Sequence, residues 1–323
     1  IDPNGKKIFD YKKNNLRLMG YSVKTSVTLN LIQFRKKIFT SDKDKNAIPY
    51  VTSYYKKNWG FCASKKEKSN LKNGQYKIKI DTKFKKSSFK FGEIFKKGIS
   101  KKEIIFSTYI CHPSLANNEI SGPVVAIFLS KFINKIKNKF SYRFIFSSET
   151  VGTIGYINKN INNLKKNTLA GFILTCVGDE RNYSFLPSKY GNTIADRVSK
   201  KILNKAKLKI KYYTWKDRGS DERQFCSPGV DLPFCSIMRS KYGEYKEYHT
   251  SMDQLDTVVT SKGLLQTINL YKKVIQEFER LDFPVCTKIC EPFLTKYKLY
   301  PTISHMGIEK KTHNVEPDAF NFS

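Results

Sequence analysis

Between residues 103 and 281, short apolar runs alternate with segments of helical periodicity, and this alternation restricts the fold more than any other feature. The run EIIFSTYIC reads as a buried strand, and the segment GPVVAIFLSKFINKI that follows it has the apolar spacing of an amphipathic helix. Further strands are predicted at 142–148, 169–177, 209–215 and 231–238, and further helices at 152–164, 192–206 and 263–281. The pattern predicts an α/β fold, a three-layer sandwich around a central, mostly parallel mixed sheet of about six to eight strands.

Residues 23–98 interrupt this alternation. They are rich in Lys, Ser and Thr, with short alternating runs such as QYKIKIDTKF and an aromatic stretch, IPYVTSYYKKNWGFC. We interpret them as an inserted β-rich subdomain, so that residues 1–22 and 99–282 form the α/β domain. Residues 283–323 change character again and are interpreted as the start of a further small module, which is truncated. The chain begins with Ile and no charged-then-apolar leader follows, which favours a fragment or a processed chain over a secreted precursor.

The formal net charge of +31 would ordinarily indicate binding to nucleic acid or to an anionic surface. However, the basic residues are mostly Lys, they are scattered in pairs, and Asn and Ile are also abundant, as in proteins from AT-rich genomes. A solvated lysine surface is therefore favoured over specific nucleic-acid binding, with a polyanion or membrane-surface role as the alternative. No apolar run reaches about 18 residues, so no membrane span is predicted.

The seven cysteines are an odd number, and Cys111, Cys176 and Cys235 lie within apolar runs. These three are expected to be reduced core cysteines of a cytoplasmic protein. Cys286 and Cys290 are four residues apart, but no second Cys/His pair lies near them, which disfavours a zinc knuckle.

Four short segments concentrate the residues that could carry chemistry. They are CHPSLANNEISG (111–122), SSETVGTIGY (147–156), RGSDERQFCSPGVDLP (218–233) and EYHTSMDQLD (247–256). His112 and Glu149 each follow the end of a predicted strand, and Asp179 follows a third one. Because functional residues of parallel sheets gather at the carboxyl ends of the strands, these side chains are expected to converge.

Each of these residues also has an ordinary structural interpretation. His112 could be a core or capping histidine, and His249 could be a loop residue. Glu149 could simply favour the N-terminus of the following helix, where a negative charge is stabilised. Ser220 or Asp221 could cap the helix that starts beside them.

In this order, the four segments resemble the bacterial zinc aminopeptidase-like family related to leucyl aminopeptidases. The resemblance is closest to a branch with an inserted β-rich subdomain, and it extends over about residues 1–300. It implies that His112 and His249 are metal-binding histidines and that Glu149 is the general base. Three carboxylates of the wider family are replaced here, and the residues at these positions are Asn118, Thr150 and Thr175.

Two divalent ions at close range need a bridging anion and several carboxylates, so one zinc ion is predicted rather than two. The candidate metal ligands are His112, Asn118, Glu119 and His249, and the candidate catalytic groups are Glu149 and Asp221. Glu119, Glu149 and Asp179 are left open as the carboxylate that completes the metal site. A free carboxylate would take a proton from zinc-activated water, and Asp221 or Glu222 would hold a substrate ammonium or hydroxyl group.

The resemblance implies a metal-dependent hydrolase of aminopeptidase type, which cleaves an amide with a free amino group or an aminoacyl conjugate. Its partner would be a peptide or an aminoacyl small molecule. Two alternatives are a catalytically degenerate fold that serves as a binding or scaffold module, and a metal-independent acyltransferase that uses the same pocket. Relatives of this branch resemble proteins of surface polysaccharide biosynthesis, so an aminoacylated or acylated sugar is conceivable as substrate. A homo-oligomer is left open.

Overall fold

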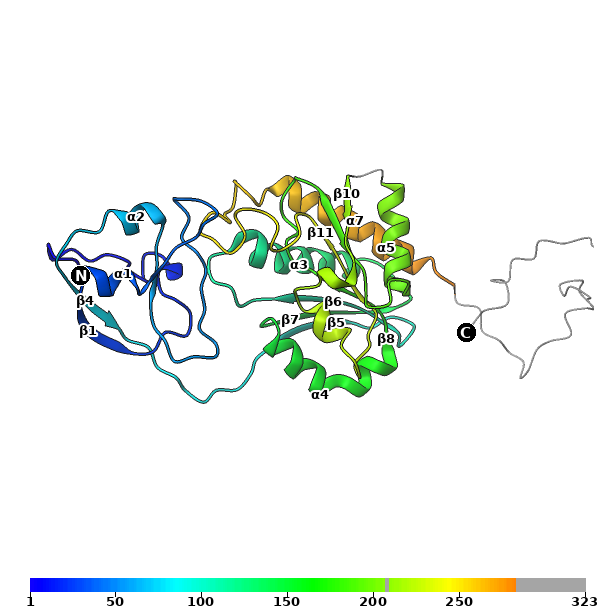
Figure 1. Ribbon diagram of the computed structural model, residues 1–323. Coiled ribbons are helices and arrows are strands. Elements are labelled where there is room, and N and C mark those ends of the chain that lie inside the picture. Colours follow the sequence, from blue (N-terminus) through cyan, green and yellow to red (C-terminus); the bar gives the residue numbers. More distant parts are fainter. Residues whose placement is uncertain (207–208, 283–323) are drawn as a thin grey trace, which may run out of the picture. The chain divides into compact units, whose positions relative to one another are not determined.

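A mixed sheet of seven strands organises the computed structural model, which describes residues 1–206 and 209–282 (Figure 1). The strands lie in the order β10-β9-β11-β8-β6-β7-β5. Their bounds are β5 (Gly92–Lys96), β6 (Glu103–Tyr109), β7 (Ser141–Ser147), β8 (Thr168–Ile173), β9 (Tyr183–Leu186), β10 (Ile210–Tyr212) and β11 (Phe234–Met238). Four neighbouring pairs are parallel, and only β5–β7 and β9–β11 are antiparallel. The predicted α/β fold with a mostly parallel mixed sheet is confirmed.

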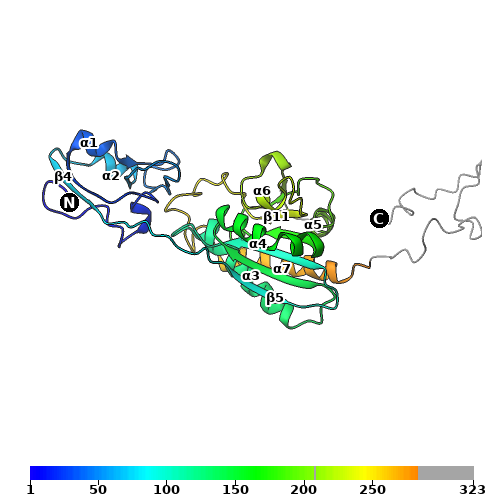
Figure 2. The same cartoon turned by 90° about the horizontal axis from the view of Figure 1, so that it is seen from below.

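Helices cover both faces of this sheet, which makes the unit three-layered (Figure 1). One face carries α3 (Ser121–Asn134), α5 (Ile194–Lys205) and α7 (Ser261–Glu279), and the other carries α4 (Val151–Asn167) and α6 (Glu222–Phe225). Seen from below, α4 lies in front of the sheet (Figure 2). None of the helices in the described part of the chain is long and apolar enough to cross a membrane.

Strand β6 shows why this arrangement follows from the sequence. All seven of its residues are buried, as expected for a central parallel strand that is covered on both faces. Phe106 points to one face, where its ring lies 5.8 Å from the ring of Tyr271 on α7. Ile105 points to the other face and packs in a cluster with Ile157 of α4. The alternation of side chains along the strand thus joins both helical layers to one core.

Gly122 allows the start of α3 to approach the strand ends closely. A Cβ atom at this position would lie 2.2 Å from the carbonyl oxygen of Leu174 and 2.4 Å from Oγ1 of Thr108. Any other residue would push the helix away from β6 and β8. The glycine therefore places the turn before α3, which carries Asn118 and Glu119, at the edge of the sheet.

The first 80 residues form small elements with a core of their own. These elements are η1 (Asn15–Arg17), β1 (Thr25–Asn30), α1 (Leu31–Arg35), β2 (Ile38–Phe39), β3 (Phe61–Cys62), α2 (Lys65–Ser69) and β4 (Gln75–Ile80). β1 pairs with β4 antiparallel and β2 pairs with β3 parallel, apart from the central sheet. The centre of this core is formed by Phe34, Tyr76 and Ile78, and Phe9 packs against it from the preceding segment.

The proposed boundaries of the inserted subdomain stay a prediction. β5 falls within the predicted insert, at 92–96, yet it is an edge strand of the central sheet. Residues 1–279 cluster as one compact unit. The predicted C-terminal module at 283–323 lies outside the described residues.

The predicted elements of the α/β region are present, and two strands were missed. β9, with the sequence YSFL, and β5, with the sequence GEIFK, are short and carry polar residues, so neither has the apolar run of a central strand. The strand predicted at 231–238 begins only at Phe234, because Pro233 has no backbone N–H to offer a neighbouring strand. The last residue of the strand predicted at 209–215 belongs instead to the short 3₁₀ helix η3 (Trp215–Asp217).

Four of the five described cysteines are buried, namely Cys62, Cys176, Cys226 and Cys235. Cys111 is exposed, so the predicted core position of this residue is wrong. The reason is that β6 already ends at Tyr109, and Cys111 belongs to the loop that follows. Cys286 and Cys290 lie outside the described residues.

Glu67 takes part in both a capping box and an ion pair, so we can predict how its replacement changes the stability of the fold. Glu67 accepts hydrogen bonds from the Ser64 backbone N–H and hydroxyl, and its two oxygens each accept one from Arg17 at 2.7 Å. Arg17 is the main cause that lowers the pKa of Glu67 from 4.5 to about 2. We expect Glu67→Ala to lower the free energy of unfolding at pH 7 by about 1 kcal/mol.

Because the pKa of Glu67 is lower in the folded state, its stabilising contribution is complete above pH 4.5 and is lost as the pH falls towards 2. Urea denaturation at pH 7 and at low pH measures this change. Glu67→Gln is the control, since it keeps an acceptor for the cap and removes only the charge. A destabilisation by Glu67→Ala that is the same at both pH values would contradict the prediction.

Candidate metal and catalytic site

His112 lies in the loop after β6, and a carboxylate holds its imidazole ring. The turn η2 (Ala116–Ile120), a single π-helical turn, carries Glu119, whose Oε2 lies 3.1 Å from His112 Nδ1. Both side chains are buried. Because Glu119 occupies the Nδ1 side, Nε2 is the ring nitrogen that is left to face a ligand.

Glu149 follows β7 and lies on the Nε2 side of His112. Its Oε2 is 3.7 Å from His112 Nε2, and its Oε1 accepts a hydrogen bond of 2.8 Å from the Ser220 hydroxyl. The next residue, Thr150, has a φ of +61°, a sparsely populated conformation for a β-branched residue, so the turn into α4 is strained. Burial raises the pKa of Glu149, while the nearby His112 opposes this shift.

His249 comes from the long loop between β11 and α7 and meets His112. The centroids of the two imidazole rings are 5.2 Å apart. His249 Nε2 is buried and has no hydrogen-bond partner among the described residues. Burial, together with His112, lowers the pKa of His249 to about 3. A neutral imidazole with an unpartnered nitrogen is suited to bind a metal ion.

Tyrosine rings surround the two histidines. Tyr50 lies 5.1 Å from the ring of His112 and 5.2 Å from that of His249, and its backbone N–H donates to the His249 carbonyl at 2.8 Å. Tyr109 lies 5.3 Å from His112, and Tyr248 stacks on His249 at 3.9 Å. Tyr50 was missed as a site residue. The only signal for it in the sequence was the aromatic stretch that contains it.

Asn118 occupies the position at which the wider family has a bridging aspartate. Its Nδ2 donates to the Tyr109 hydroxyl at 2.7 Å, and its Oδ1 is buried without a hydrogen-bond partner in the described residues. Thr175, another replaced position, forms a hydrogen bond of 2.6 Å with the same Tyr109 hydroxyl. The two neutral side chains are thus linked through Tyr109.

Asp179 and Asp253 hold the loops of the site in place. Asp179 accepts hydrogen bonds from the Asn117 amide and from the backbone N–H and hydroxyl of Ser240. It is thereby engaged in loop contacts, and we do not assign it to the metal. Asp253, which sequence reasoning missed, accepts the backbone N–H groups of Asn117 and Asn118 at 2.7 and 3.0 Å. It anchors η2 and hence Glu119.

Asp221 and Glu222 are fully buried on α6 and beside its start. Asp221 Oδ1 accepts the Thr150 N–H at 2.8 Å, and Glu222 Oε1 accepts the hydroxyl of Tyr242 at 2.7 Å. Burial, followed by the charge of Glu149, raises the pKa of Asp221 to about 7. The second oxygen of each carboxylate, Asp221 Oδ2 and Glu222 Oε2, has no partner among the described residues. Neither side chain caps the helix or faces bulk solvent.

Cys111 adds a potential metal ligand that the sequence did not suggest. Its Sγ lies 3.3 Å from His112 Nδ1, and the ligand atoms of Cys111, His112 and Glu119 lie within 4.8 Å of one another. Although the residue as a whole is exposed, the packing around its Sγ atom, together with the nearby carboxylates of Glu119 and Glu149, raises the pKa of the Cys111 thiol to about 12. Its Sγ lies on the Nδ1 side of His112, the side that Glu119 occupies, and not on the Nε2 side that we assign to the metal.

The mixed sheet with helices on both faces is an α/β fold like that of bacterial aminopeptidases. Residues 2–281 match the family described as "Domain of unknown function (DUF4910)", and the chain belongs to this family. A protein of Clostridium acetobutylicum (strain ATCC 824), named "Putative polysaccharide biosynthesis protein with aminopeptidase-like domain", is 37% identical over 303 residues, which are 93% of this chain and 68% of that protein.

Solved structures also show that the chain has an aminopeptidase-like fold. A crystal structure of a "putative peptidase" from Clostridium acetobutylicum has a TM-score of 0.83 at 36% identity and covers 91% of this chain and 69% of that one. BSAP, a zinc aminopeptidase from Bacillus subtilis, has a TM-score of 0.58 at 16% identity and covers 79% and 69% of the two chains. The resemblance to bacterial zinc aminopeptidases is confirmed, and the likeness to BSAP shows the shared fold.

Proposed function

We propose that this protein is a metal-dependent hydrolase of aminopeptidase type, which cleaves an amide with a free amino group or an aminoacyl conjugate. One observation carries the proposal: in a fold shared with zinc aminopeptidases, His112 and His249 lie with their rings 5.2 Å apart, and Glu149 stands 3.7 Å from His112 Nε2. The sequence segments of these three residues are far apart along the chain, so the fold itself brings them together.

We assign one zinc-like ion to this place as part of the proposal. His112 Nε2, His249 Nε2 and Asn118 Oδ1 are the three donors that we assign, and the last two are buried atoms without a partner in the described residues. Unpaired buried polar atoms are costly, so a ligand that uses them would stabilise the site. Among the described residues, the carboxylates within 4 Å of His112 are those of Glu119 and Glu149, which leaves too little negative charge for a second cation.

Each remaining group has a separate role in this proposal. Glu119 fixes the ring of His112 through Nδ1 and is a positioning residue rather than a ligand. A zinc ion held by these donors would polarise the scissile carbonyl and lower the pKa of a bound water. Glu149, whose pKa is raised by burial, takes a proton at Oε2 from the attacking water and returns it to the leaving amine.

Asp221 has two proposed roles. Through Oδ1 it holds the backbone of Thr150 and with it the turn that presents Glu149. The second role is to accept a hydrogen bond from a substrate ammonium group through the unpartnered Oδ2, or through Oε2 of Glu222, and it requires the substrate to reach atoms that are buried in this structure. A substrate with a free amino group is the class that such carboxylates would select.

Elemental analysis of protein purified without chelator, combined with hydrolysis assays, tests the proposal. The assay panel should hold aminoacyl p-nitroanilides and, because of the name of the Clostridium relative, aminoacylated amino sugars. We expect about one equivalent of zinc and metal-dependent release of the free amino acid. Protein without metal and without activity after zinc is added would favour a binding or scaffold module. A cytoplasmic location, which rests on the reduced buried cysteines, and a homo-oligomer stay proposals.

Tyr50 gives a further prediction for this site. We expect Tyr50→Ala to weaken zinc affinity by about tenfold, because the ring that packs against both histidines is lost. Tyr50→Phe keeps the ring and should retain near wild-type affinity. Competition with a chromogenic chelator measures both variants. Equal losses in the two variants would point to the hydroxyl group instead of the ring.

A further inference from the structure

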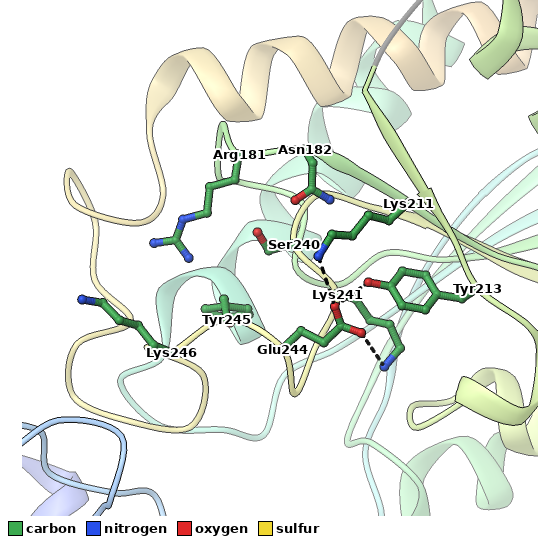
Figure 3. Close-up of a pocket in the computed structure, with 9 residues that line it drawn as sticks. All are labelled: Arg181, Asn182, Lys211, Tyr213, Ser240, Lys241, Glu244, Tyr245 and Lys246. Carbon is green, nitrogen blue, oxygen red and sulfur yellow. Dashed lines mark hydrogen bonds and ion pairs between the residues drawn. The ribbon is translucent and has the colours of Figure 1, made fainter.

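A cavity of about 280 Å³ lies beside β9 and β10 and contains four basic side chains (Figure 3). Arg181 lies before β9, Lys211 lies on β10, and Lys241 and Lys246 lie on the loop after β11. Glu244 is the one acidic residue of the lining. The proposed hydrolase site uses none of these five residues.

Three hydrogen-bond donors already converge on one anionic group in this cavity. Lys211, Tyr213 and Lys241 all extend toward the carboxylate of Glu244 (Figure 3). The Tyr213 hydroxyl donates to Oε2 at 2.5 Å, Lys211 Nζ lies 3.6 Å from the same oxygen, and Lys241 Nζ lies 4.0 Å from Oε1. Two ammonium groups and a hydroxyl at such distances form a donor set that suits phosphate oxygens, and the carboxylate stands in for them here.

The charges of the cavity are not balanced by Glu244. Lys211 and Lys241 share this single carboxylate, while Arg181 is paired with Glu247 through two hydrogen bonds of 3.0 Å. The lining itself thus holds four basic side chains and one acidic one. Glu247 at Arg181 and Asp217 near Lys241 offset part of this positive charge, and the remainder favours an anionic ligand over a neutral one. A phosphate monoester carries about two negative charges at pH 7.

A ligand can also displace the carboxylate of Glu244. Its side chain is 39% exposed, so solvent already reaches the carboxylate. The carboxylate can thus turn to solvent without a buried group being left unpaired. From Lys211, Tyr213, Lys241 and Glu244 we infer that this cavity binds the phosphate group of a small phosphorylated molecule, which replaces the Glu244 carboxylate.

Isothermal titration calorimetry on the full chain in about 0.15 M NaCl tests this inference, with glucose 1-phosphate and inorganic phosphate as probes. We expect one binding event per chain. Lys211→Ala combined with Lys241→Ala should weaken it at least about tenfold, because two charge-assisted contacts are lost. Lys211→Glu, at a side chain that is 57% exposed, repeats the test without removing a packed group. A thermal melt shows whether each variant is folded.

The net charge of +31 makes non-specific attraction the main competing explanation, so each variant needs a control with the same change of charge. Lys85→Ala combined with Lys86→Ala removes two exposed lysines elsewhere and should leave binding unchanged. Glu244→Gln should tighten binding several-fold, whereas Asp42→Asn, at an exposed carboxylate, should not.

The two probes distinguish a phosphorylated molecule from free phosphate as the ligand. Tighter binding of glucose 1-phosphate than of inorganic phosphate would mark the phosphate as the handle of a larger ligand, and equal binding would indicate a free anion as the ligand. The inference is overturned if neither probe binds, or if the Lys85 and Lys86 control loses as much affinity as the Lys211 and Lys241 variant.

Discussion

Replacement of Glu149 by Gln is expected to lower turnover by about 10²–10⁴-fold while the metal content stays unchanged. Gln has nearly the same shape and can still accept the hydrogen bond from Ser220, but it cannot take a proton from water. The raised pKa of Glu149 brings its proton affinity closer to the range that a general base needs at neutral pH. Steady-state kinetics and elemental analysis on the same preparation measure the two quantities.

Glu180→Gln is a matched control, because this carboxylate lies at the surface, where it pairs with Lys262. It should leave turnover at the wild-type level. If Glu149→Gln lost the metal instead, Glu149 would be a ligand and another group would have to act as base. Unchanged turnover in this variant would remove Glu149 from the mechanism.

Replacement of His249 by Ala is expected to reduce the zinc content from about one equivalent to below about 0.1, with complete loss of hydrolysis. The substitution leaves His112 and Asn118 as donors, and two protein ligands seldom retain zinc. Glu119→Gln should have a milder effect, a loss of about 10–100-fold in affinity, because it disturbs only the orientation of His112.

Glu180→Gln serves again as the control, because this surface carboxylate pairs with Lys262 and the proposed metal site does not use it. Elemental analysis after gel filtration gives the metal content of each variant. Two equivalents of zinc in the wild-type chain would contradict the single-ion site. Full zinc content in His249→Ala would show that the ion is bound elsewhere, with the group of Cys111, His112 and Glu119 as the first place to look.

The core of the site could be predicted because its residues follow strand ends. His112 and Glu149 come directly after β6 and β7, and neighbouring parallel strands place such residues at one edge of the sheet. The role of Glu119 could not be predicted in this way. Its carboxylate is directed to His112 Nδ1 by the π-helical turn η2, and a local turn of this kind leaves no periodic signal in the sequence.

The sequence by itself determined the class of fold, because buried strands and amphipathic helices have distinct periods, and it named the side chains of the candidate site through its four segments. Only the tertiary structure decided which further residues join them. Tyr50 reaches both histidines, and Asp253 anchors Asn117 and Asn118 from more than 130 positions away. Contacts at such separations depend on how whole elements pack, and no local pattern of residues encodes them.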